Sequence, residues 1–207
     1  MSRKNVTLAP LLESKEGNGT VLEGLSSGFF LEMMELLGKR TGELHLALAS
    51  KEGGKDFKPE SFSILYQRSV YQSMRTLVRW VLRLLEDSRR NLSDEASALA
   101  EDILHSRDDI LCCLQRITGR KIAAKKIRIH GDYHLGQVLF TGKDFVIIDF
   151  EGEPARALSE RRLKRSPLRD VAGMIRSFHY SAFFGFLRNQ TYQGDDKALL
   201  EKWLIIW

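Results

Sequence analysis

The sequence is poor in cysteine and contains no long apolar run. Only two cysteines occur among the 207 residues, the neighbours Cys112 and Cys113. Adjacent positions on a helix point in different directions, so this pair cannot form a disulfide framework. Apolar stretches such as "SAFFGFL" are far shorter than the roughly 18 to 20 residues of a membrane span, and the N-terminus lacks a signal-like apolar core. We therefore expect a cytoplasmic protein without a membrane partner.

Charge of one sign is only in modest excess. Lysine and arginine number 32 against 27 acidic residues, which gives a formal net charge of +5. No aromatic-interleaved basic stripe or zinc-finger spacing accompanies this charge, so a nucleic-acid partner is not expected. The basic run "RRLKR" at 161–165 leaves two interpretations open, a solvated loop or a place near phosphate.

Helical periodicity dominates from residue 29 onward. Apolar residues recur at spacings of three, four or seven in "FFLEMMELLGKRTGELHLALAS", where Leu37 and Leu44 share one face. Further helices are predicted at about 61–87, from 93 and over 107–119. His45 and His105 lie on these helices without evident partners, and we predict no catalytic role for either.

A later helix is predicted from Ser166, with Pro167 as its first helical residue. One face of this helix should carry the apolar residues Leu168, Val171, Ile175, Phe178 and Ala182. A last helix should begin near Asp195. Residues 1–27 are rich in Gly, Ser, Glu and Asn and predict an irregular or short-strand segment.

The pattern changes at Lys126. "KIRIH" alternates, "QVLF" is apolar, "TGKD" is typical of a turn and "FVIIDF" strongly favours a strand. A hairpin-like pair of strands is therefore predicted after four helices. The expected fold class is α+β and mainly helical.

Two carboxylates and an amide are placed around this hairpin. Asp132 lies in a loop after one strand and Asp149 at the end of another, so a hairpin closed by "TGKD" could bring both to the same end. Hard cations such as magnesium prefer such oxygens. Gln137, five residues beyond Asp132, adds a neutral amide oxygen. A base, a neutral oxygen ligand and an acidic ligand are what metal-assisted phosphoryl transfer requires.

The motifs "HGDYHLGQ" and "IDFEG" follow the order of the catalytic-loop and D-F-G motifs of protein kinases. Gln137 stands where asparagine is usual, and Glu151 is inserted before Gly152. The segment "IRIHGDYHLGQVLFTGKDFVIIDFEGEPARALSERRLKRSPLRDVAGMIRSFHY" is closely similar to the maltokinase family, which includes domains fused to trehalose synthases. "LYQRSVYQSMR" and "GELHLALAS" resemble that family too, so the similarity extends over most of residues 29–207.

This resemblance implies the larger C-terminal lobe of a protein-kinase-like fold, with a small β-hairpin that carries the catalytic loop. It also implies ATP-dependent phosphorylation of maltose at the anomeric hydroxyl, which gives maltose 1-phosphate. Magnesium would be the cofactor, and trehalose synthase a possible associated or fused partner. On this view residues 1–28 are an irregular remnant of the smaller lobe or hinge, and residues 29–207 are a larger lobe truncated at its C-terminus.

Carried over by position, the resemblance makes Asp132 the catalytic base and makes Gln137 and Asp149 the magnesium ligands. His130 would orient the loop. Asp170 would hold the catalytic loop, although a carboxylate in the first turn of a helix could equally stabilise the helix dipole. Two further residues are assigned to the sugar pocket, His134 and Glu151.

Two other functions stay open at this point. "GDYH" also fits the G-D-x-H segment of metallophosphoesterases, but the upstream D-x-H and downstream G-N-H-D-like segments are absent, and Leu135 replaces a usual glycine. A non-catalytic kinase-like module is the second alternative. It is suggested by the absence of a P-loop and of a "VAIK"-like lysine, and by the wrong spacing of "GNGTVLEG" for a kinase glycine loop.

Overall fold

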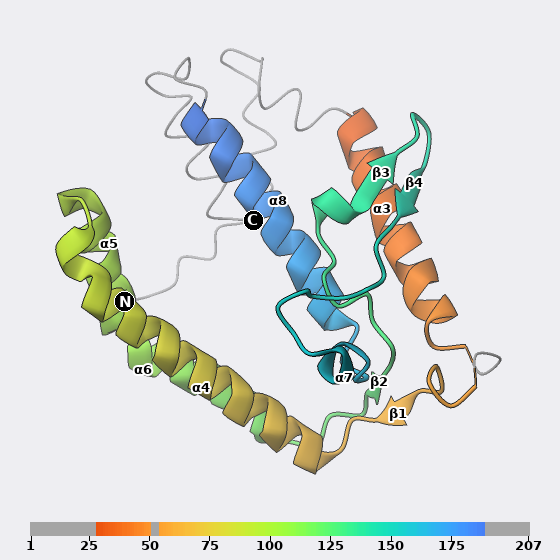
Figure 1. The fold of residues 1–207 in the computed structure, drawn as a ribbon, viewed down its shortest axis with the longest axis horizontal. Coiled ribbons are helices and arrows are strands. Elements are labelled where there is room, and N and C mark those ends of the chain that lie inside the picture. Colours follow the sequence, from red (N-terminus) through yellow and green to blue (C-terminus); the bar gives the residue numbers. More distant parts are fainter. Residues whose placement is uncertain (1–27, 51–53, 189–207) are drawn as a thin grey trace. The chain divides into compact units, whose positions relative to one another are not determined.

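The computed structural model of the chain describes residues 28–50 and 54–188 (Figure 1). The predicted irregular segment before residue 28 and the predicted helix near Asp195 lie outside this part. The described residues form two units, Glu60–Lys126 and the residues on either side of it, and each unit is described by itself. No helix in the described ranges is both long and apolar enough to cross a membrane.

The unit Glu60–Lys126 is helical and is closed by a two-residue sheet. Strands β1 (Glu60–Ser61) and β2 (Lys125–Lys126) pair antiparallel. The helices between them are α4 (Ile64–Ser88), η1 (Arg89–Asn91), α5 (Asp94–His105), α6 (Arg107–Gln115) and η2 (Arg116–Thr118). The helices predicted from 93 and over 107–119 are therefore confirmed, the latter as an α-helix that ends in a 3₁₀ turn.

The second predicted helix begins later than about residue 61. Ser61 belongs to strand β1, and Ser63 caps α4 by accepting a hydrogen bond from the Tyr66 N–H at 3.2 Å. The predicted strand in "KIRIH" was too long, because regular pairing stops at Lys126 and only an isolated bridge joins Ile127 to Arg165. Pairing with β1 ends there because the backbone N–H and carbonyl of Ile127 are both hydrogen-bonded to Arg165, at 2.9 Å in each direction.

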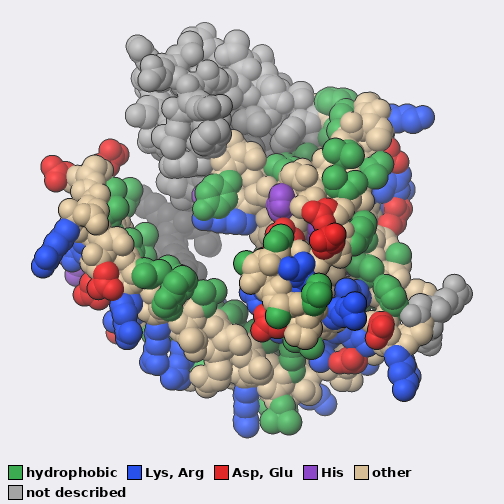
Figure 2. Space-filling model, in the orientation of Figure 1, with side chains coloured by type: hydrophobic (Ala, Val, Ile, Leu, Met, Phe, Trp, Pro, Cys, Tyr) green, Lys and Arg blue, Asp and Glu red, His purple; other side chains and the backbone are tan. Residues whose placement is uncertain are grey.

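A buried amide side chain joins helix α4 to the chain that follows α6. Many of the apolar side chains of α4 are nevertheless exposed. Gln67 is 1% exposed, and its amide donates to the carbonyls of Ile117 and Arg120 and accepts from the Ile122 N–H. These bonds satisfy a group that would otherwise be costly to bury. Large apolar side chains of α4 stay exposed (Figure 2), namely Ile64, Leu65, Leu77, Trp80, Val81 and Leu84.

The other unit contains a long helix, a hairpin and a second long helix (Figure 1). Its elements are α3 (Gly28–Ala47), η3 (Leu135–Gln137), β3 (Val138–Phe140), β4 (Phe145–Ile147), α7 (Leu158–Arg161) and α8 (Leu168–Arg188). Strands β3 and β4 pair antiparallel, with Val138 opposite Ile147 and Phe140 opposite Phe145. This confirms the hairpin and its "TGKD" turn, although β4 ends at Ile147 and not at Phe150.

The core of this unit joins α3, α8 and the chain between them. Leu37, Tyr133 and Met174 are its buried residues, and Phe178 packs against them. The predicted apolar face of α8 was partly wrong, because Leu168 and Ile175 are 69% and 50% exposed. The buried side instead runs through Asp170, Met174 and the partly buried Phe178, at spacings of four, because the helix turns a polar residue toward the loop beside it.

A bidentate ion pair ties the hairpin turn to α3. Arg40 Nε donates to Asp144 Oδ1 at 2.8 Å, and Nη2 donates to Oδ2 at 2.7 Å. Asp144 also accepts from the Phe145 N–H at 2.7 Å. The Arg40 hydrogen bonds, with the backbone bond to Phe145, lower the pKa of Asp144 to about 2.

We predict that Asp144→Asn changes the acid sensitivity of folding. A carboxyl whose folded-state pKa lies below its unfolded value stabilises the folded state above the unfolded pKa, and this stabilisation is lost as pH falls. The wild type should be more stable than Asp144→Asn above about pH 4, and the two should converge toward pH 2. Urea unfolding at several pH values measures this, with the exposed Asp56→Asn as control. A difference between wild type and Asp144→Asn that persists at pH 2 would contradict the prediction.

Candidate active site

The loop that carries Asp132 is held from below by one buried carboxylate. Asp170 lies in the first turn of α8 and is 2% exposed. Its Oδ1 accepts from the Gly131 N–H at 3.0 Å, and its Oδ2 accepts from the His130 N–H at 2.9 Å. Two successive backbone donors therefore converge on one side chain, and this fixes the peptide groups on either side of His130, two residues before Asp132.

His45 is the third partner of this carboxylate. Its Nε2 lies 3.0 Å from Asp170 Oδ2, and its side chain is 12% exposed. The prediction that His45 has no partner was wrong, because the partner is 125 residues away in sequence. His105 contacts the carbonyl of Glu101 on its own helix. The contact between His45 and Asp170 links α3 to the loop through α8, and no local sequence pattern predicts it.

His130 links the loop to the end of β4. It is 2% exposed, and its Nε2 donates to the carbonyl of Ile148 at 2.8 Å, which leaves Nδ1 to accept from the Asp132 N–H at 3.4 Å. Its ring lies 5.1 Å from the Phe150 ring, between centroids. Both ring nitrogens are thus occupied by backbone groups. Residues 130–132 lie beside the segment that contains Asp149.

Tyr133 is a buried anchor that sequence reasoning missed. It is 3% exposed, and its hydroxyl lies 2.8 Å from Thr41 Oγ1. Because Thr41 Oγ1 donates to the carbonyl of Leu37, it accepts from the Tyr133 hydroxyl. Burial raises the pKa of Tyr133. The only signal for this role was an aromatic residue directly after Asp132, which by itself indicates nothing about its depth.

Gln137 and Asp149 meet at the open end of the hairpin. Gln137 Nε2 donates to Asp149 Oδ2 at 3.0 Å, and the Ile148 N–H donates to the carbonyl of Gln137 at 3.0 Å. Strand pairing thus continues for one residue beyond β4 and places the two side chains together. Asp149 has a φ of 60°, a conformation that is uncommon for a residue with a side chain and that is often found at functional sites.

An amide oxygen and a carboxylate side by side suit a hard cation, so Gln137 and Asp149 fit magnesium chemically. In the described part of the chain, no three His, Cys, Asp or Glu side chains gather into a metal-binding group. A cation here would therefore need oxygens from water or a substrate phosphate.

Two predicted site residues remain, His134 beside Asp132 and the exposed Glu151. His134 accepts from the Gly136 N–H through Nδ1 at 3.1 Å, and its Nε2 lies 3.8 Å from Asp132 Oδ2. The Asp132 side chain is 33% exposed, so a substrate can reach it. Glu151 is exposed two residues beyond Asp149. The structure brings His134 to Asp132, but it shows no contact of Glu151 with the other predicted residues.

Helix α8 approaches this loop closely because it carries a glycine there. A Cβ atom at Gly173 would lie 2.7 Å from the carbonyl oxygen of Tyr133, which is closer than such atoms come. One turn later, Ser177 Oγ accepts from the Leu135 N–H at 3.0 Å. Asp170, Gly173 and Ser177 share one face of α8, and their spacing of three and four was a signal that sequence reasoning could have used.

The profile of the phosphotransferase enzyme family matches residues 31–153. Over 54 residues, 26% of this chain, the sequence is 46% identical to the glucosamine kinase of Mycolicibacterium smegmatis and 33% identical to that of Streptacidiphilus jiangxiensis. These alignments cover 13% and 12% of the two relatives, so the chain matches only a small share of their length.

Solved glucosamine kinase structures share the fold. One crystal form superposes with a TM-score of 0.71 over 89% of this chain and 39% of that protein, at 19% identity. A complex with glucosamine, ADP and inorganic phosphate superposes with a TM-score of 0.65 over 82% of this chain and 38% of that protein, at 20% identity. The predicted mainly helical, kinase-like fold is therefore confirmed.

We predict that Gly173→Ala disturbs the Asp132 loop. The added methyl group should gain roughly 0.5 to 1 kcal/mol of helix propensity but lose roughly 1 to 3 kcal/mol through the clash with Tyr133, so the protein should be destabilised. Chemical unfolding measures the change. Gly38→Ala on α3 is the matched control, because nothing beyond its own helix backbone and chain neighbours lies within 4 Å of its added Cβ, and it should be neutral or stabilising. Equal effects of the two substitutions would refute the close approach.

Asp170→Asn separates the two interpretations of that residue. An amide offers one acceptor oxygen, so one of the two backbone N–H groups loses its partner, and we expect a loss of roughly 1 to 3 kcal/mol. Hydrogen exchange at the Gly131 or His130 amide should become faster. If Asp170 only stabilises the helix dipole, the loss should be about 0.3 to 1 kcal/mol, with exchange at both amides unchanged.

Proposed function

This chain belongs to the phosphotransferase enzyme family, and we propose that it transfers the terminal phosphoryl group of ATP to a sugar hydroxyl. One observation carries this proposal. An accessible carboxylate, Asp132, follows a braced loop that lies beside the strained segment where Asp149 meets Gln137. Phosphoryl transfer depends mostly on positioning and charge stabilisation, and a rigid loop of this kind supplies positioning.

In the proposed step, Asp132 orients the sugar hydroxyl and accepts its proton. The hydroxyl oxygen forms the new bond to the terminal phosphorus of ATP, the bond to the bridging oxygen breaks, and ADP leaves with the electron pair. The hydrogen bonds from the His130 and Gly131 N–H groups to Asp170 hold the backbone that leads into Asp132. His130, with both nitrogens bonded to backbone groups, positions the loop and does not transfer protons.

Gln137 and Asp149 are the proposed magnesium ligands. The bound cation would neutralise charge on the nucleotide phosphates. To serve as a ligand, the Gln137 amide must turn its oxygen toward the cation and give up its hydrogen bond to Asp149. His134 and Glu151 are proposed sugar contacts, His134 because it lies beside Asp132 and Glu151 because it is exposed on the neighbouring segment.

Maltose is one candidate substrate, with maltose 1-phosphate as its product. It rests on the similarity of residues 127–180 to the maltokinase family, in which glutamine at position 137 is usual. On this proposal residues 29–207 contribute the larger lobe of a kinase-like protein, and an association with or fusion to trehalose synthase is part of the same proposal.

Glucosamine is the second candidate substrate. It is supported by the two curated relatives, one of them 46% identical over 54 residues, whose names state that activity. Because the chain covers less than two fifths of the solved relatives, substrate choice could depend on residues beyond the aligned part.

A substrate panel tests the proposal. The protein that contains this chain, with ATP and magnesium, should phosphorylate maltose or glucosamine and not an aminoglycoside. Asp132→Asn should lower kcat roughly 10² to 10⁴-fold, because the amide keeps the size and removes the base. The exposed Asp102→Asn is the control and should act like the wild type.

Each other result of this panel is informative. Normal turnover in Asp132→Asn would remove Asp132 from the catalytic role. Release of phosphate without a sugar acceptor would favour a hydrolase. A protein that neither binds nucleotide nor turns over any substrate would favour the non-catalytic module.

A further inference from the structure

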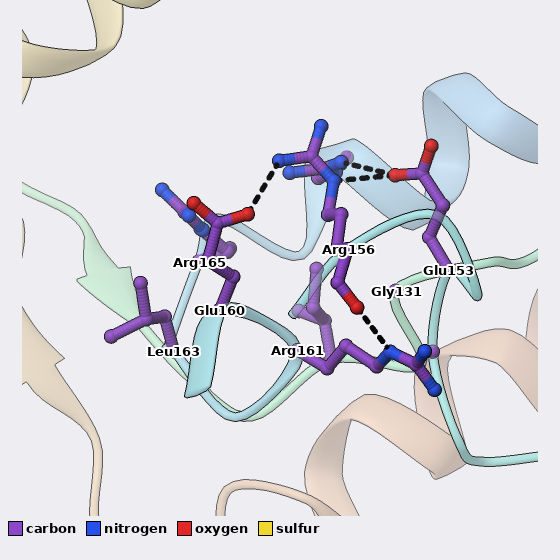
Figure 3. A pocket seen from close by; sticks show the side chains of 10 residues that line it. Gly131, Glu153, Arg156, Glu160, Arg161, Leu163 and Arg165 are labelled. Carbon is purple, nitrogen blue, oxygen red and sulfur yellow. Dashed lines mark hydrogen bonds and ion pairs between the residues drawn. The ribbon is translucent and has the colours of Figure 1, made fainter. Parts of the chain in front are cut away.

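A pocket lies beside Gly131, and four of its ten lining residues are arginines. It is a small hollow that is partly open to solvent, with Gly131 and Gly152 among its lining residues. Its charged lining consists of Arg156, Arg161, Arg165, Arg169, Glu153 and Glu160 (Figure 3). Four arginines against two glutamates leave two positive charges in excess. Basic side chains lie beside acidic ones over the α7 region in the space-filling view (Figure 2).

Arg156 forms ion pairs with both glutamates of the pocket. Arg156 pairs with Glu153 through Nε and with Glu160 through Nη1, the latter at 3.7 Å, and Figure 3 shows Arg156 between the two carboxylates. Arg169 reaches only Glu153, at 3.4 Å. The acidic charge in the pocket is therefore largely taken up by Arg156.

The other guanidinium groups have no acidic partner of their own. Arg161 donates to the carbonyls of Arg156 and Pro154, each at 2.8 Å, which satisfies its hydrogen bonds but not its charge. Among the described residues, the side chain of Arg165 has no hydrogen bond or ion pair. An anion that entered the pocket would therefore find free donors on Arg165 and poorly neutralised charge on Arg169.

The cations of this pocket also oppose one another. Burial lowers the pKa of Arg169, and the charges of Arg156 and Arg165 lower it further. Arginine nevertheless stays charged in proteins, so the repulsion persists as a cost to the folded state. A bound anion with two negative charges would relieve this cost and balance the excess charge.

The side chains that line the pocket favour phosphate over other anions. Guanidinium groups match the oxygens of phosphate geometrically and donate bidentate hydrogen bonds to them. No aromatic residue lines the pocket, so nothing there would stack on a nucleobase. We propose that this pocket binds a phosphate dianion, either inorganic phosphate or the phosphate end of a sugar phosphate, with Arg165 and Arg169 as its principal donors.

The place of the pocket connects it to the proposed active site. Gly131 lines the pocket and directly precedes Asp132, and Arg169 directly precedes the loop-holding Asp170. A bound phosphate would link the residues after β4 to the start of α8 and so stiffen both supports of the loop. Binding itself does not depend on the proposed function, whereas any effect on turnover does.

The test is phosphate binding in the absence of divalent metal. Without metal, phosphate cannot be held through a cation at Gln137 and Asp149. Calorimetry and the shift in Tm with inorganic phosphate measure binding at constant ionic strength, with chloride as the comparison salt. We expect saturable binding to the wild type and roughly tenfold weaker binding to Arg165→Gln, which loses a charge-assisted contact. Arg162→Gln, an exposed neighbour outside the pocket lining, should bind like the wild type.

The outcomes separate clearly. Because the Arg165 side chain has no partner and its charge opposes that of Arg169, Arg165→Gln should keep or raise the wild-type Tm in phosphate-free buffer, which excludes misfolding as the cause of weak binding. A sugar 1-phosphate that binds more tightly than inorganic phosphate would identify a product-like ligand, and the reverse order would identify free phosphate; both support the site. The proposed phosphate site would be overturned if the wild type showed no saturable binding, or if all three proteins bound phosphate equally. The arginines and glutamates would then form only an ion-pair network.

Discussion

The carboxylate of Asp170 is the interaction on which the candidate site depends. It is nearly inaccessible to water, and it accepts two consecutive backbone N–H groups while also contacting His45. A buried charge is tolerated only when such donors surround it. The same bonds join three parts of the chain, α3, α8 and the loop before Asp132, so the position of the proposed base follows from the packing of two helices.

Close approach and polar contacts reinforce this arrangement. Gly173 lets the α8 backbone come against the Tyr133 carbonyl, and Tyr133 in turn reaches Thr41 on α3. The ion pair between Arg40 and Asp144 ties the hairpin turn to the same helix. The loop is therefore held on several sides, which would supply the preorganisation that the proposed phosphoryl transfer requires. It leaves Asp149 exposed and Asp132 and Gln137 partly exposed, and these are the residues to which the proposal assigns chemistry.

Much of the fold and of the candidate site could be predicted from local patterns. The hairpin, its turn and the cap of α5 at Ser93 depend on neighbouring residues, although α4, which Ser63 caps, was predicted to begin at about residue 61. The order of the two motifs likewise pointed to Asp132, Gln137 and Asp149 before any coordinates. The buried face of α8 was harder, because its most buried residue is an aspartate and an apolar pattern cannot identify a polar residue that faces inward.

By itself, the sequence determined the α+β class, the hairpin and which side chains are candidates for chemistry, since these depend on residue type and short spacing. The tertiary structure alone decided that His45 meets Asp170, that Tyr133 is buried, and that Arg165, in the basic run at 161–165, lines one pocket together with Gly131. The physical reason is separation along the chain. Contacts between residues more than 90 positions apart, such as Thr41 with Tyr133, leave no periodic trace in sequence and arise only when helices pack.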